Sequence, residues 1–240
     1  MPQTAALLIA HGAPSCPPSQ EFALADMAAR AEAAGAGPMI AATLAARRPF
    51  DAKVAQALDG GGPVIVYPMF MSDGWFSGTH LPRRLAAAGL DAARARMLAP
   101  FGMDPLLPAL CARRALEAAA RMGLPPERVA LVLAAHGAPS NKRPAEVTRE
   151  VAAHIALLAP FRSVTCGFVD QPPHLAEALS LDGPAICLPF FATRASHVIV
   201  DLPEAVAAAG FDGPVLGPIG LDPAIPELIA AAVRRARTEG

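Results

Sequence analysis

The chain has 240 residues, 53% of them hydrophobic, and its formal net charge is −1 at neutral pH. This length accommodates one large domain or two domains of about 120 residues, each able to bury a core. The apolar fraction is typical of globular proteins and excludes a disordered chain. A net charge this close to zero gives no electrostatic footprint for nucleic acid or an anionic membrane, so we expect neither as a partner.

The chain also lacks the sequence signals of secretion and membrane insertion. No apolar run approaches the ~20 residues that a membrane helix needs, and no basic segment precedes the first apolar run. The four cysteines are scattered and form no Cys-x-x-Cys pair, which argues against a disulfide framework and against a structural zinc site. We therefore expect a cytoplasmic protein.

Short apolar runs alternate with longer alanine-rich segments along the whole chain. In the first half, we predict strands over residues 5–10, 39–44, 64–67 and 96–99, and helices over 20–34 and 104–121. In the second half, we predict strands over residues 129–134, 163–169, 185–188 and 214–216, and helices over 145–158 and 223–237. Continuous apolar character favours parallel strands covered on both faces. The order predicts an α/β fold in which each half has a roughly four-stranded parallel sheet flanked by helices.

The sequence is duplicated. His11-Gly12-Ala13-Pro14-Ser15 returns as His136-Gly137-Ala138-Pro139-Ser140, and Asp104-Pro105 returns as Asp222-Pro223. Each copy is far longer than a solenoid repeat, so we predict two tandem halves, residues 1–122 and 123–240. Each Asp-Pro pair places a capping residue before a proline, which is typical of a helix start.

The register of the repeat shows that the two halves are not equivalent. Pro68 matches Pro189 at an offset of 121 residues, the difference between 189 and 68, and this offset holds through the following segment. It aligns His197 with Phe76 and Asp201 with His80. The offset of the first histidines, between 11 and 136, is 125 and places Asp170 opposite Ala45.

Polar side chains therefore gather at predicted strand ends in the second half. These are His136, Asp170, His197 and Asp201, whereas the first half offers only His11 and a displaced His80. In parallel sheets, ligands bind outside the carboxyl ends of the strands. Two imidazoles and a carboxylate suit a divalent transition metal with open coordination positions, and they also suit a base that takes protons near neutral pH.

Taken in order, these motifs resemble the class II tetrapyrrole chelatases of the sirohydrochlorin cobalt- and iron-inserting type. The resemblance covers the whole chain as two chelatase-like halves. It is carried by the two His-Gly openings and by the run from Pro189 to Pro203, in which Pro189-Phe190-Phe191 is followed by His197 and by Asp201-Leu202-Pro203.

The resemblance implies a lyase that inserts Co²⁺ or Fe²⁺ into sirohydrochlorin or a related tetrapyrrole, in cobalamin or siroheme synthesis. His136 and His197 match the histidines that hold the metal and remove pyrrole protons, and Asp170 falls where a glutamate is usual. His11 matches the first histidine of the other copy and is a further candidate metal ligand, as is His80. The metal is a substrate, and no organic cofactor is implied.

Other readings stay open. The duplicated fold could carry a tetrapyrrole or a metal without catalysing insertion, or it could be a structural paralogue that has lost activity. Trp75, the only tryptophan, lies in a loop that could stack on a flat macrocycle or fold onto the core. Asp201 is a second candidate contact to the substrate. We expect a monomer or a homodimer, since a duplicated chain can supply internally the interface that a single-domain relative obtains by dimerising.

Overall fold

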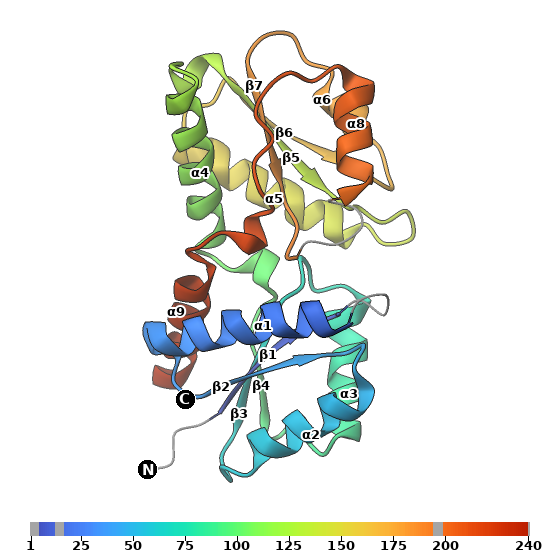
Figure 1. Cartoon of the computed structure of the whole chain (residues 1–240), viewed down its shortest axis with the longest axis vertical. Coiled ribbons are helices and arrows are strands. Elements are labelled where there is room, and N and C mark those ends of the chain that lie inside the picture. Colours follow the sequence, from blue (N-terminus) through green and yellow to red (C-terminus); the bar gives the residue numbers. More distant parts are fainter. Residues whose placement is uncertain (1–4, 13–16, 194–198, 240) are drawn as a thin grey trace. The chain divides into compact units, whose positions relative to one another are not determined.

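The computed structural model describes residues 5–12, 17–193 and 199–239 (Figure 1). The chain folds into two compact units. Unit 1 comprises Met1–Asp104 together with Pro223–Gly240, and unit 2 comprises Pro105–Asp222. Among the described residues, no helix has both the length and the apolar character needed to cross a membrane.

Unit 1 is a four-stranded parallel sheet with strand order β2-β1-β3-β4. Its strands are β1 Ala6–Ala10, β2 Met39–Thr43, β3 Val64–Pro68 and β4 Ala95–Met97. Its helices are α1 Pro17–Ala31, η1 Glu32–Ala36, α2 Arg47–Leu58, η2 Phe76–His80, α3 Leu81–Ala87, η3 Phe101–Met103 and α9 Ile225–Thr238. Helices α1 and α9 pack together over one face, and α2 and α3 cover the other (Figure 1).

The central strand shows why this sheet forms. Every residue of β1 is buried, because side chains that alternate along a strand meet helices on both faces. Leu7 and Ile9 join the same core cluster as Phe50 and Val54 of α2. The predicted parallel sheet, covered on both faces, is confirmed in unit 1.

Unit 2 is a three-stranded parallel sheet with strand order β6-β5-β7. Its strands are β5 Ala130–Ala135, β6 Ser163–Phe168 and β7 Ala185–Pro189. Its helices are α4 Leu107–Arg121, η4 Pro126–Arg128, α5 Arg143–Leu158, α6 Leu175–Leu179, α8 Asp201–Ala209 and η5 Ile219–Leu221. Helices α4 and α5 pack together beside the sheet, and α6 packs with α8 (Figure 1).

The fourth strand that we predict over residues 214–216 is wrong as a full strand. The segment makes a single bridge, between Val215 and Cys187. Two backbone hydrogen bonds hold it, from Cys187 N–H to the Pro214 carbonyl and from Leu216 N–H to the Cys187 carbonyl. Pro214 and Pro218 have no N–H to donate, so the ladder cannot extend in either direction.

Helices α4 and α9 are exchanged between the two sequence repeats. Helix α4 follows β4 in the first repeat but packs on α5 and β7 in unit 2, whereas α9 ends the second repeat but packs on α1, η1 and β3 in unit 1. The compact units therefore divide the chain differently from the predicted halves 1–122 and 123–240, which describe the sequence repeat.

The aspartates of the two Asp-Pro pairs anchor the exchanged helices. The N-cap positions of α4 and α9 fall on Leu106 and Ala224, two residues after the predicted capping aspartates. In unit 1, the buried Asp104 accepts a hydrogen bond from the Tyr67 hydroxyl at 3.1 Å and lies 3.9 Å from the Arg235 guanidinium of α9. In unit 2, Asp222 pairs with Arg114 of α4 at 2.6 Å.

We expect Asp104→Ala to lower the free energy of unfolding by about 3 kcal/mol, because it leaves the buried Tyr67 hydroxyl without its acceptor and removes the counter-charge of Arg235. Burial raises the pKa of Tyr67 well above its usual value, so the hydroxyl remains a donor throughout the physiological range. Denaturant unfolding of Asp104→Ala and Tyr67→Phe measures the effect. The matched control is Asp26→Ala, which removes only an exposed pair with Arg30 and should cost about 0–1 kcal/mol. Equal stability of Asp104→Ala and the control would contradict this role.

Candidate active site at the strand ends

His136 and Asp170 meet at the carboxyl edge of the unit 2 sheet. His136 directly follows β5, and Asp170 lies two residues beyond β6. The Asp170 N–H donates to the His136 carbonyl at 3.0 Å, so the backbone fixes the two residues side by side. Their side chains are 3.2 Å apart, Nδ1 to Oδ2, and are 41% and 43% exposed. The predicted proximity of this histidine and this acid is therefore present in the structure.

The partners of His136 determine which ring nitrogen carries the proton. Nδ1 lies 3.0 Å from the Gly137 carbonyl and 3.2 Å from the Asp170 carboxylate. A carbonyl oxygen only accepts hydrogen bonds, so Nδ1 must be the donor. The neutral ring then has its lone pair on Nε2, the atom that can bind a metal or take a proton.

Gly137 and Gln171 shape the turn that holds this pair. Gly137 has φ +71°, and a Cβ there would lie 2.7 Å from Gln171 Cγ, so the turn requires glycine. The Ala138 N–H donates to Gln171 Oε1 at 2.8 Å. Gln171 belongs to no sequence motif, and the one feature that marks it in the sequence is its place beside Asp170 at a strand end.

Unit 1 repeats the backbone of this site without its carboxylate. The Ala45 N–H donates to the His11 carbonyl at 2.9 Å, just as Asp170 does to His136, which confirms that Ala45 stands opposite Asp170. His11 Nδ1 lies 2.7 Å from the Gly12 carbonyl, so His11 is also held with its proton on Nδ1.

Aromatic rings occupy the space beside His11. Phe76 meets the His11 ring edge-on, with ring centroids 4.6 Å apart and planes at 87°. Trp75 stacks on His80 at 4.9 Å and 22°, and Phe76 contacts both of these rings. His80 is the last residue of η2 and lies within this aromatic group.

His197, the predicted partner of His136, falls outside the described residues. Asp201 is described and begins α8, where it is half-buried. Within residues 5–12, 17–193 and 199–239, no three His, Cys, Asp or Glu side chains group closely enough to hold a metal ion. The metal-binding roles of His136, His197, His11 and His80 stay predictions.

The described cysteines are poor candidates for metal ligands. Cys111, Cys166 and Cys187 are buried. Burial raises the pKa of Cys166 to about 11 and that of Cys187 to about 12, and it raises the pKa of Cys111 still further. A thiol must lose its proton to bind a metal, so these three side chains are core residues at neutral pH.

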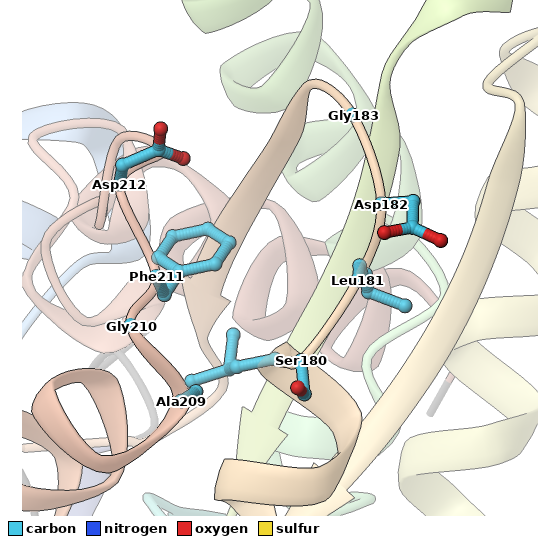
Figure 2. A pocket seen from close by; sticks show the side chains of 9 residues that line it. Ser180, Leu181, Asp182, Gly183, Ala209, Gly210, Phe211 and Asp212 are labelled. Carbon is cyan, nitrogen blue, oxygen red and sulfur yellow. The ribbon is translucent and has the colours of Figure 1, made fainter.

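Unit 2 has a pocket at the opposite edge of its sheet (Figure 2). It is lined by residues 179–183, which lead into the amino end of β7, and by residues 209–212 after α8. Its two carboxylates, Asp182 and Asp212, lie on opposite sides of the pocket in Figure 2 and do not converge. The strand ends that carry His136 are at the other edge, so this pocket is not part of the candidate site.

The CbiX family profile matches residues 5–118 and again residues 130–236. The chain belongs to the CbiX family. The two matches agree with the duplication and with the predicted resemblance to chelatases. No curated protein gives a significant match.

Solved structures similar to this CbiX family member include a close full-length neighbour. The CbiX of denitrifying bacteria, described as the terminal enzyme for biosynthesis of siroheme, is 42% identical, with a TM-score of 0.83 over 97% of this chain and 99% of that one. SirB from Bacillus subtilis with Fe³⁺ is 17% identical, with a TM-score of 0.73 over 98% of this chain and 97% of that one. The sirohydrochlorin chelatase SirB of subspecies spizizenii, in complex with cobalt, is 16% identical, with a TM-score of 0.73 over 98% and 95%. At such identities the two SirB structures show the shared fold.

Proposed function

We propose that this protein is a sirohydrochlorin chelatase, which inserts Co²⁺ or Fe²⁺ into the tetrapyrrole during siroheme or cobalamin synthesis. Family membership and the 42% identity to a CbiX described as the terminal enzyme of siroheme biosynthesis support the reaction class. The observation that carries the assignment to unit 2 is the His136–Asp170 pair, held at the carboxyl edge of the sheet with Nδ1 and Oδ2 3.2 Å apart.

The reaction exchanges two pyrrole N–H protons for one divalent cation. The metal is a substrate that the protein must hold and then release into the macrocycle. In our proposal, Nε2 of His136 binds the metal or accepts a pyrrole proton, because Nδ1 already donates to oxygen acceptors. Asp170 stabilises the imidazolium that forms when His136 takes a proton.

His197 would supply the second imidazole in this proposal. It comes after β7 in the sequence, and β7 lies next to β5 in the sheet. The carboxyl ends of neighbouring parallel strands meet at one edge, so in this proposal the two histidines act at the same edge of the sheet. Asp201 follows four residues later at the start of α8 and would contact the substrate.

Unit 1 is the weaker candidate for metal chemistry. Its His11 has the same tautomer, but Ala45 replaces the acid and Phe76 stands at the position aligned with His197. In this proposal, His11 and His80 serve as secondary metal contacts. The same proposal places the protein in the cytoplasm, as a monomer or homodimer that meets a diffusible tetrapyrrole.

Anaerobic insertion of Co²⁺ or Fe²⁺ into sirohydrochlorin, followed by absorbance, tests the proposal. Wild-type protein should exceed the spontaneous rate, and His11→Ala should retain most of the excess. A wild-type rate equal to the spontaneous rate would refute the chelatase assignment. Loss of all activity in His11→Ala would assign the active site to unit 1 and contradict its assignment to unit 2. Tight tetrapyrrole binding without turnover would favour a carrier.

A further inference from the structure

The aromatic group of unit 1 lies at the carboxyl edge of its sheet. Phe76 contacts the ring of His11, the residue directly after β1, and lies parallel to Phe70 just beyond β3, with centroids 6.4 Å apart and planes at 6°. Trp75 and His80 pack against Phe76. We call Trp75, Phe76 and His80 the aromatic platform.

Two members of the platform are exposed far more than such rings usually are. Trp75 is 56% exposed and Phe76 is 42% exposed. The indole is stacked on His80 at 22°, so its exposed surface is the part that does not face the imidazole. Of the two alternatives for Trp75, folding onto the core is contradicted, because the indole is largely exposed and packs against Phe76 and His80.

The turn that carries Trp75 is held in place by its own hydrogen bonds. The buried Ser77 hydroxyl donates to the Ser72 carbonyl at 2.8 Å and lies 3.3 Å from the Gly74 carbonyl. The Gly78 N–H donates to the Gly74 carbonyl at 2.8 Å. A ring presented in a fixed orientation loses little conformational freedom when it binds a ligand.

A cationic side chain follows the rings along the same helical stretch. Arg83 is exposed and follows His80 by three residues, and the backbone is helical through His80 and Leu81 into α3, so the two side chains share a helix face. A flat conjugated ring system with carboxylate substituents is the ligand that matches rings beside a guanidinium. Sirohydrochlorin has this chemistry.

We infer that the aromatic platform of unit 1 binds one face of the tetrapyrrole, with Trp75 stacked on the macrocycle. This inference rests on the proposed function. It also accounts for Phe76 at the position aligned with His197: a ring that supports Trp75 has replaced a metal ligand. Trp75 is thus a positioning residue for the substrate.

Two measurements on the full chain test the platform. Metal-free sirohydrochlorin is titrated into wild type, Trp75→Ala and Trp75→Phe, and binding is followed by the absorbance of the tetrapyrrole. We expect Trp75→Ala to weaken binding about tenfold and Trp75→Phe to stay within about threefold of wild type, because a phenyl ring retains most of the stacking. In insertion assays, Trp75→Ala should raise the KM for sirohydrochlorin by a similar factor and leave kcat unchanged.

Leu157→Ala is the matched control, since Leu157 is 84% exposed near the carboxyl end of α5 and should not affect binding. Wild-type affinity and KM in Trp75→Ala, with insertion intact, would overturn the platform and leave the proposed function standing. If binding depends on Trp75 but the wild-type protein does not insert metal faster than the spontaneous rate, the platform is supported and the proposed function is overturned. A fall in kcat alone would assign Trp75 to another step and overturn the inference.

Discussion

His136→Ala is expected to reduce metal insertion into sirohydrochlorin to the spontaneous rate. The substitution removes the only side chain at the end of β5 that can bind metal or accept a proton, and a positioned base contributes about 10²–10⁴-fold to a rate. Initial rates of anaerobic Co²⁺ insertion measure the loss. His154→Ala is the matched control, because His154 is an exposed residue of α5 and should keep the wild-type rate.

Asp170→Asn should have an intermediate effect. The amide keeps the shape of the side chain near His136 Nδ1 but loses the charge that stabilises the imidazolium. We expect a rate loss of about 10–100-fold, the range for residues that orient a metal-binding histidine. Wild-type activity in both His136→Ala and Asp170→Asn would show that the chemistry does not use this pair.

Gly220→Ala is expected to have the largest effect on stability. Gly220 approaches the backbone of Ala192 so closely that a Cβ would lie 2.1 Å from the Ala192 carbonyl oxygen, and its N–H donates to the Phe191 carbonyl at 2.9 Å. Because the obstacle is backbone, it cannot move aside as a side-chain tip could. We expect the free energy of unfolding to fall by about 3 kcal/mol or more, measured by denaturant titration.

Gly217→Ala provides the matched control, since a Cβ at Gly217 meets nothing within 4 Å and should change stability by less than about 0.5 kcal/mol. Gly220 also fixes the segment that follows β7 and leads toward His197. The variant should therefore lose insertion activity even at temperatures where it remains folded. Equal unfolding curves for Gly220→Ala and Gly217→Ala would contradict this account.

The same close approach occurs in unit 1. A Cβ at Gly102 would lie 2.1 Å from the Met71 carbonyl oxygen, and Gly102 N–H donates to the Phe70 carbonyl at 2.9 Å. This contact holds the segment between β3 and the aromatic platform. Both units thus have a glycine in a short helical turn that packs closely against the segment following β3 or β7.

The register of the repeat, read from the sequence alone, predicts much of the candidate site. An uninterrupted offset of 121 residues aligns Phe76 with His197. The offset of the first histidines aligns Ala45 with Asp170, and the matching backbone hydrogen bonds of these two residues confirm the second alignment. The register can be predicted because a strand and the turn after it are local sequence patterns, and both repeats have proline and glycine at the same positions. The buried strands were readable for a similar reason, since their apolar runs are continuous.

Local sequence patterns do not specify which sheet each amphipathic helix covers, and the tertiary structure decides this. Helices α4 and α9 begin with related Asp-Pro segments and each has an apolar face, so the sequence does not specify which sheet each one covers. The exchange is decided by long-range packing and by the pairing of Asp104 with Arg235 and of Asp222 with Arg114. The contacts of the aromatic platform could not be predicted from the sequence either, because they join rings that are far apart in the chain. His11 and Phe76, for example, are separated by 65 residues. The sequence by itself determined the fold class and which half has both the histidine and its acid. Tertiary packing determined which helices complete each unit. It also determined that His11 contacts an aromatic ring, whereas His136 contacts a carboxylate.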